Sequence, residues 1–235
     1  AVAVAAIPQS LVAAVTVILA IGMIRLLRRR ALVRRLVSAE TLGGTTVACV
    51  DKTGTLTRGE MHVEQVETEH GTHEARVAVL MSGMLANDAY FDTDPESGDV
   101  VARGEPTDRA FLDAGLENDL YKEYQQRGNL LRDTKPFSSD TKYIAALEER
   151  DDHMVIHIKG APERIIEAAG AYAGGDASGE GASELALTDE KQSQLMARGE
   201  ELSRQGFRVI VVAAKTIQRA YESGDRIGGF DEDPI

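Results

Sequence analysis

The first 24 residues carry no charged side chain, and six arginines follow within the next eleven residues. A helix of 24 residues is about 36 Å long, enough to cross a hydrocarbon core of about 30 Å. The sequence therefore predicts a transmembrane helix over residues 1 to 26, with the arginines and everything after them on the cytoplasmic side. A signal peptide would place its basic residues first and its cleavage site last, the reverse of this order. A buried helix of a soluble protein is the other alternative.

The remainder of the chain is acidic. Residues 36 to 235 hold 20 basic and 38 acidic side chains, a net charge of −18. Such a body repels nucleic acid, and no basic surface interleaved with aromatic residues suggests RNA or DNA binding, so we expect no nucleic-acid partner. The single cysteine, Cys49, excludes an internal disulfide and is expected to be buried. The histidines lack the spacing of a zinc site, and His153 and His157 are expected to face solvent or a neighbour.

Hydrophobic spacing divides the chain into predicted helices and strands. The β-branched run over 45 to 50 has the composition of a central parallel strand, and Asp51 follows at its end. The patterns also predict a loop over 92 to 104, a hairpin with strands at 143–147 and 154–158, a flexible insertion over 170–184 and a buried strand over 209–214. Helices are expected over 25–42, 74–89, 106–116, 162–169 and 190–205.

Asp51 lies in a setting that suits a nucleophile toward phosphate. Lys52, Gly54 and the neighbouring threonines supply a cation, main-chain amides and hydroxyls that can surround phosphoryl oxygens. A lone Asp on a loop is ordinarily a cap or a turn former. The seven residues 51 to 57, Asp-Lys-Thr-Gly-Thr-Leu-Thr, however, resemble the phosphorylation signature of the P-type ATPases, a branch of the haloacid dehalogenase-like phosphotransferases.

The resemblance assigns roles within this segment. It implies that Asp51 forms an aspartyl phosphate with Lys52 beside it, and that Asp51 and the main-chain carbonyl of Thr53 bind Mg²⁺. Soluble phosphatases of the same superfamily usually carry a second Asp as general acid-base where this chain has Thr53. The phosphoenzyme is therefore expected to be long-lived.

Four further segments, at 104–108, 137–142, 159–163 and 206–209, resemble the nucleotide pocket of the calcium, sodium-potassium and proton pumps. The resemblance implies ATP binding by Asp108, Phe137, Lys142, Lys159, Gly160 and Arg208. The Phe137 ring is expected to stack on the adenine, and Lys142 and Arg208 to lie near the phosphates. The alternatives are core packing for Phe137, an ordinary helix start at 159–163 and a solvated surface arginine at 208.

Pro8 interrupts the apolar segment and frees a backbone carbonyl. Residues 5 to 11 resemble the broken fourth transmembrane helix of these pumps, which implies that Ile7 and Gln9 contact the transported cation. A plain proline kink is the alternative. The calcium-pump branch usually has Glu in place of Gln9, so the resemblance leaves the identity of the cation open.

The chain is thus identified as a fragment of a P-type cation-transporting ATPase, from the fourth transmembrane helix through the nucleotide-binding domain. The implied fold class is α/β: a partial haloacid dehalogenase-like (Rossmann-like) phosphorylation domain with an inserted α+β nucleotide-binding domain, preceded by a transmembrane helix. The expected domains are a transmembrane helix over 1–26, a stalk helix over 27–44, the first part of the phosphorylation domain over 45–68, the nucleotide-binding domain over 69–224, and the truncated return to the phosphorylation domain over 225–235.

The parent protein is expected to be an ATP-driven cation pump that crosses the membrane several times. The implied cofactor is Mg²⁺, and the implied partners are ATP, the transported cation, membrane lipid and the missing remainder of the pump. The motifs that complete the phosphorylation domain do not occur in this sequence, so the fragment alone is expected not to turn over ATP. An isolated nucleotide-binding module and a soluble dehalogenase-like phosphatase remain as alternatives.

Overall fold

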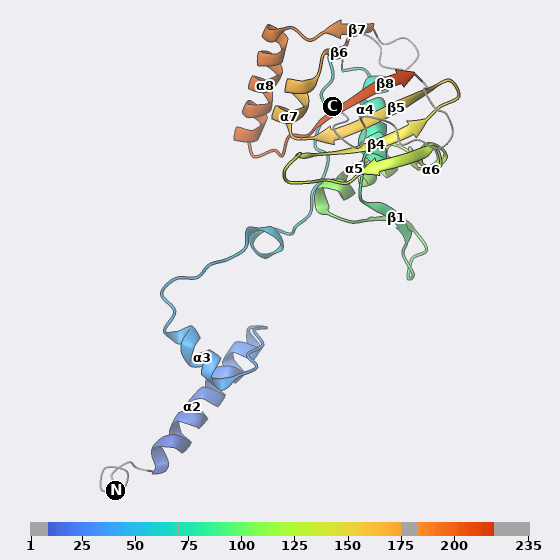
Figure 1. Ribbon diagram of the computed structural model, residues 1–235. Helices are drawn as coiled ribbons and strands as arrows, with labels where there is room; N and C mark the ends of the chain where they lie inside the picture. The colour runs from blue at the N-terminus through green and yellow to red at the C-terminus, as the bar shows by residue number, and fades with distance from the viewer. Residues whose placement is uncertain (1–8, 70, 175–182, 219–235) are drawn as a thin grey trace. The chain divides into compact units, whose positions relative to one another are not determined.

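The computed structural model describes residues 9–69, 71–174 and 183–218. The chain forms two compact units, residues 1–58 and residues 59–235. The first unit contains α2 (Gln9–Arg28), α3 (Leu36–Gly43) and a five-residue π-helix, η1 (Lys52–Leu56) (Figure 1).

A break separates α2 from α3, so the single helix expected over 25 to 42 is wrong. Arg30 has a φ of 63°, a left-handed conformation that a non-glycine residue rarely adopts, and the chain turns there. Three consecutive arginines, Arg28 to Arg30, lie at the turn.

Among the described residues, no helix is both long and apolar enough to cross a membrane. The first eight residues of the predicted transmembrane helix lie outside the described residues. The predicted transmembrane helix over 1–26 is therefore not found in the described part of the chain.

The strand expected at 45–50 is also wrong, because these residues form no regular structure. Val47 and Val50 are 76% and 52% exposed, and Cys49 is exposed instead of buried. A strand exists only where a neighbour accepts its hydrogen bonds, and no strand pairs with this segment in the described residues. The β-branched composition of residues 45–50 does not reveal whether a pairing strand is present.

The second unit is mixed α/β, with antiparallel strands in every sheet. Its central sheet has the order β3-β4-β5-β8. These strands are β3 (Leu131–Lys135), β4 (Tyr143–Glu149), β5 (His153–Gly160) and β8 (Val211–Gln218). Two small hairpins pair β1 (Tyr90–Thr93) with β2 (Val100–Arg103), and β6 (Ala171–Gly174) with β7 (Ser183–Ala186).

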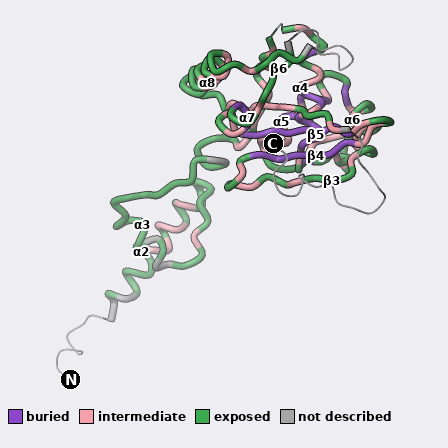
Figure 2. The backbone as a smooth tube through the Cα atoms, turned by 45° about the horizontal axis from the view of Figure 1, so that its top comes forward, coloured by how far each residue is buried: buried purple, intermediate pink, exposed green. Residues whose placement is uncertain are grey.

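Helices pack on the central sheet in two groups. The first is α4 (His73–Leu85), α5 (Pro106–Glu117) and α6 (Tyr121–Gly128), and the second is α7 (Pro162–Ala168) and α8 (Asp189–Arg204). Helix α4 contacts β5 and β8, whereas α7 contacts the same two strands and α8 (Figure 1). Both faces of β4 and β5 are buried as a result (Figure 2).

Successive side chains of a strand point to opposite faces of the sheet, and in β5 the two faces carry different kinds of side chain. Met154, Ile156 and Ile158 of β5 join an apolar cluster with Ile165 of α7. The intervening positions include His157 and Lys159, whose side chains reach Ser82 and Gly83 of α4. The α4 side of the sheet therefore contains the buried polar and charged side chains.

Several predicted elements are confirmed, because their hydrophobic periodicity is local. The helices expected over 74–89, 106–116, 162–169 and 190–205 appear within a few residues as α4, α5, α7 and α8, and the predicted hairpin appears as β4 and β5. Strand β8 begins two residues after the predicted start. The loop expected at 92–104 is instead the β1–β2 hairpin, and β6 and β7 occupy parts of the insertion expected at 170–184.

Candidate functional site

Lys159 is a buried lysine near the end of β5. It is 3% exposed, and its Nζ lies 2.8 Å from Oδ1 of Asp108 and donates to the Gly83 carbonyl at 3.2 Å. The ammonium also lies 4.5 Å from the centre of the Phe111 ring. Burial lowers the pKa of Lys159, and the Asp108 carboxylate opposes that shift. These contacts fix the position of the lysine and compensate its charge.

Asp108 reaches this position because the start of α5 is tied to the end of α4. Pro106 lies in the first turn of α5, where the missing N–H costs no hydrogen bond. Asn87 donates from Nδ2 to the main-chain oxygens of Asp108, at 3.0 Å, and of Gly83, at 3.3 Å. Gly104 has a φ of 138°, and a Cβ there would lie 2.8 Å from Cα of Ala89, so only glycine suits this approach.

The loop between β3 and β4 carries an exposed aromatic ring. Phe137 is 56% exposed, and its backbone N–H donates to Oδ2 of Asp88 at 3.4 Å. Asp88 also acts electrostatically on Lys159. The core packing weighed for Phe137 is thus not observed, and the ring face can accept a planar ligand.

Lys142 ends the same loop in a left-handed conformation, with a φ of 60°. Its N–H donates to the Ser138 carbonyl at 2.7 Å, and its own carbonyl accepts from the Ala161 N–H at 3.0 Å. A Cβ on Gly160 would lie 2.4 Å from the Lys142 carbonyl oxygen. Glycine at 160 therefore allows the loop and the β5–α7 junction to touch along their backbones.

Two exposed cations border this region. Lys142 Nζ lies 3.1 Å from Oε1 of Glu163, and both side chains are just over half exposed. Arg208 precedes β8 and donates from Nη1 to the Thr107 hydroxyl at 3.0 Å, next to Asp108 in sequence. An exposed ring, two exposed cations and a buried Lys–Asp pair are suited to a ligand with a planar base and a polyanionic tail.

All six residues predicted to bind ATP lie in the second unit, where Lys159 pairs with Asp108 and Gly160 approaches Lys142. Arg208 bonds to Thr107 beside Asp108, and the Phe137 backbone bonds to Asp88, which acts electrostatically on Lys159; we call this set of residues the Lys159 network. The six predicted residues are Asp108, Phe137, Lys142, Lys159, Gly160 and Arg208. Their roles stay predictions. The sequence reasoning assigned no role to Asp88, and none to Thr107 or Glu163 although both lie inside recognised segments. Only their contacts, with partners 21 to 101 residues away, draw attention to them.

The residues predicted to accept phosphate lie in the first unit. Asp51 and Lys52 are exposed, and Lys52 begins η1. Within the turn, the Thr57 hydroxyl donates to the Lys52 carbonyl at 3.3 Å, and Gly54, with a φ of 75°, donates its N–H to the Thr57 hydroxyl at 3.4 Å. Residue 7, predicted to contact the cation, lies outside the described residues, and Gln9 is the first residue of α2.

The predicted Mg²⁺ ligands do not make a complete site by themselves. Mg²⁺ requires about six oxygen ligands in an octahedron. Asp51 offers a carboxylate and Thr53 a main-chain carbonyl, and no cluster of three or more metal-binding side chains occurs in the part of the chain that the structure describes. The two residues fit only as a partial ligand set.

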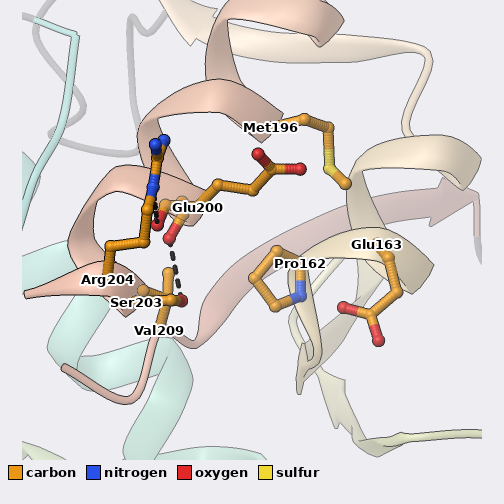
Figure 3. A pocket seen from close by; sticks show the side chains of 8 residues that line it. Pro162, Glu163, Met196, Glu200, Ser203, Arg204 and Val209 are labelled. Atoms are coloured by element: carbon orange, nitrogen blue, oxygen red, sulfur yellow. Dashed lines mark hydrogen bonds between the residues drawn. The ribbon is translucent and has the colours of Figure 1, made fainter. Parts of the chain in front are cut away.

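A shallow hollow of about 460 Å³ lies between α7 and α8 (Figure 3). Pro162 and Glu163 line one side, and residues of α8 and Val209 line the rest. Ser203 and Arg204 bond to carbonyls of their own helix, at Gly199 and Glu200. None of the six predicted ATP-binding residues lines this hollow, so we place the candidate site at the Lys159 network.

Behind that network, on the α4 side of the sheet, lies a buried ionic cluster. His157 is 2% exposed, so of the two expected surroundings, solvent or a neighbour, the structure shows the neighbour. Its Nε2 lies 3.0 Å from Oε2 of Glu148, and its Nδ1 lies 3.0 Å from the Ser82 hydroxyl. Burial raises the pKa of Glu148, but hydrogen bonds from Arg127 and His157 outweigh it and hold that pKa well below its usual range.

Comparison with known proteins gives consistent results. The family model described as the P-type ATPase cytoplasmic domain N matches residues 76–232. The probable cation-transporting ATPase F of Mycobacterium tuberculosis is 35% identical over 89% of the chain and 25% of its own length. The calcium-transporting ATPase 1 of Bacillus cereus is 30% identical over 91% of the chain and 24% of its own length. Calcium-transporting ATPase type 2C member 1 of the mouse is 31% identical over 90% of the chain and 25% of its own length. The chain spans about a quarter of the length of these relatives.

Proposed function

Because this chain belongs to the P-type cation-transporting ATPases, we propose that residues 69 to 224 form the nucleotide-binding domain and bind ATP at the Lys159 network. The observation that carries the proposal is the buried Lys159–Asp108 pair. The exposed Phe137 supports it, because its backbone N–H donates to Asp88, a carboxylate that also acts electrostatically on Lys159. An ATP site needs an apolar face for the base and cations for the phosphates, and this network offers both.

In this proposal the adenine stacks on Phe137. The ring is exposed and its backbone is held by Asp88, so little rearrangement is needed for a base to bind. Stacking of a base on an aromatic side chain contributes about 1 to 3 kcal/mol. Lys142 and Arg208 face the phosphates, while Lys159 and Asp108 fix each other at the base of the site.

Displacement of a fluorescent ATP analogue by unlabelled ATP tests the site. We expect Phe137→Ala to weaken ATP binding about tenfold, because the base loses its platform, and Phe137→Tyr to retain binding. The ring is exposed, so neither change should disturb the fold. Lys159→Ala should also lose affinity, but it leaves Asp108 buried without its partner, so its melting temperature must be measured alongside. Unchanged affinity in Phe137→Ala would refute the site.

For the whole protein, we propose ATP-driven cation transport through an aspartyl phosphate at Asp51. The printed names of the relatives, cation-transporting and calcium-transporting ATPases, support transport. The signature at residues 51–57 supports the phosphorylation, and Asp51 is exposed. Residues 45–68 and 225–235 would then belong to a haloacid dehalogenase-like phosphorylation domain within a membrane pump. Mg²⁺, held in part by Asp51 and Thr53, would offset the negative charge of the reacting phosphate.

Incubation with γ-labelled ATP and Mg²⁺ tests this second proposal. In the complete pump, we expect acid-stable, hydroxylamine-sensitive label that disappears in Asp51→Asn. In the 235-residue chain, we expect little label, because Asp51 and Thr53 supply too few ligands for the metal. A complete pump that keeps its label after Asp51→Asn would exclude Asp51 as the nucleophile.

A further inference from the structure

Glu163 faces one of the two exposed cations of the proposed ATP site. Its Oε1 lies 3.1 Å from Nζ of Lys142. We infer that Glu163 is a built-in competitor of the nucleotide phosphates: it neutralises Lys142 in the free protein and must release that lysine when a phosphate binds. The inference rests on the proposed ATP site, and it assigns a specificity-determining role to a residue outside the predicted ligand set.

The backbone on both sides of this ion pair is fixed. The Lys142 carbonyl accepts from the Ala161 N–H, two residues before Glu163, and Gly160 lies against the same carbonyl. Glu163 accepts a hydrogen bond from its own backbone N–H at the start of α7, which with the Lys142 contact lowers its pKa. Most surface ion pairs lose side-chain entropy when they form. Here the fixed backbones bring the two side chains close before they pair.

The second cation has a different partner. Arg208 donates to the neutral hydroxyl of Thr107 and forms no ion pair with another described residue, so a phosphate can approach it without displacing one of their carboxylates. Lys142 Nζ, in contrast, is already bonded to a carboxylate. A phosphate that recruits Lys142 must therefore break an ion pair and approach a negative charge, whereas a ligand without phosphate does neither.

Because the pair is exposed, the expected effect is modest. Exposed ion pairs contribute at most about 1 kcal/mol, and the repulsion between like charges in water has a similar energy. Removal of the Glu163 charge should therefore tighten ATP binding about two- to fivefold. Adenosine, which has no phosphate, should bind Glu163→Gln and the wild type equally.

The test measures dissociation constants of ATP and of adenosine for the 235-residue chain at low salt. Glu163→Gln is compared with Glu167→Gln, a matched loss of charge at an exposed position one turn further along α7. Lys142→Ala and the double variant with Glu163→Gln complete a double-mutant cycle. We expect tighter ATP binding in Glu163→Gln, no change in Glu167→Gln, and a smaller gain from Glu163→Gln once Lys142 is removed.

Each other result would overturn the inference. Unchanged or weaker ATP binding by Glu163→Gln would show that the carboxylate does not compete for Lys142. An equal gain for adenosine, or a gain for ATP that is undiminished without Lys142, would show that the effect does not pass through the ion pair. If the wild-type chain bound no ATP at all, the proposed function would fail as well, whereas ATP binding that is indifferent to Glu163 would leave it standing.

Discussion

Arg127 and Glu148 form a two-pronged ion pair inside the second unit. Nε of Arg127 donates to Oε1 at 2.8 Å and Nη2 donates to Oε2 at 2.9 Å, although 21 residues separate the two in sequence. The Glu148 side chain is 1% exposed and that of Arg127 is 20% exposed. The pair joins α6 to the central sheet and keeps a buried carboxylate charged.

Loss of Arg127 should destabilise the second unit strongly. Arg127→Ala leaves the Glu148 charge buried without its principal partner, which we expect to lower the free energy of unfolding by about 2 to 4 kcal/mol. Urea denaturation followed by circular dichroism measures the change. Arg103→Ala is the control, because its pair with Asp92 is nearly half exposed and should contribute at most about 1 kcal/mol. Equal losses in the two variants would contradict the role given to burial.

Stability should fall as the solution becomes acidic, through His157. A carboxylate can only accept, so Nε2 of His157 carries the hydrogen toward Glu148, and Nδ1 accepts from the Ser82 hydroxyl. The neutral ring therefore satisfies both contacts. Burial lowers the pKa of His157 against the opposing effect of Glu148, so below about pH 6.5 the unfolded chain binds a proton that the native chain does not.

The stability provided by His157 is thus complete above about pH 6.5 and is lost as the pH falls toward the lowered native pKa. The loss amounts to at most about 1.4 kcal/mol per pH unit for a single proton. Urea unfolding at several pH values between 8 and 5 should show a smaller decline in His157→Gln, whose amide keeps a donor for Glu148 without titrating. Parallel curves for the two proteins would exclude His157 as a source of the pH dependence. The lowered pKa of Glu148 adds a loss of the same sign below about pH 4.3.

Gly160→Ala should weaken both the fold and the proposed ATP site. The new Cβ would meet the Lys142 carbonyl oxygen at 2.4 Å and Cβ of Tyr143 at 2.7 Å, and both neighbours are held by the sheet. We expect a loss of about 1 to 3 kcal/mol in unfolding free energy, together with weaker ATP binding because the loop carrying Lys142 is displaced. Gly170→Ala is the control, since nothing lies within 4 Å of its Cβ. A stable Gly160→Ala protein with normal ATP affinity would contradict this packing.

Residues 59–69, most of which we propose to belong to the phosphorylation domain, should nevertheless stabilise the unit that contains the ATP site. Val63 and Val66 pack against the cluster formed by α4 and α5, and Glu67 and Glu69 pair with Arg198 and Lys191 of α8. A chain of residues 59–235 should therefore be more stable than one of residues 71–235, by about 1 to 3 kcal/mol from the apolar contacts alone. Thermal melts of the two chains provide the comparison. Equal melting temperatures would place the start of the unit after residue 70.

Elements whose pattern repeats within a few residues could be predicted from the sequence. Helices α4, α5, α7 and α8 and the β4–β5 hairpin follow from local periodicity and from proline at helix starts. The strand expected at 45–50 failed because strand formation depends on a partner, which composition does not reveal. The left-handed Arg30 likewise interrupts a helix that hydrophobic spacing alone would continue.

Short fixed motifs were enough to identify the family of this protein, the candidate nucleophile Asp51 and the six residues proposed to bind ATP. Local periodicity was enough to place most helices of the second unit. Which charges are buried and which residues pair, in contrast, became known from the folded chain. Lys159 meets Asp108 across 51 positions, and Lys142 meets Glu163 across 21. Helix α4 covers one face of β5, and this decides between the two surroundings expected for His157, solvent or a neighbour, in favour of a buried cluster. Such contacts depend on which surfaces pack together, a property of the folded chain that no local pattern encodes.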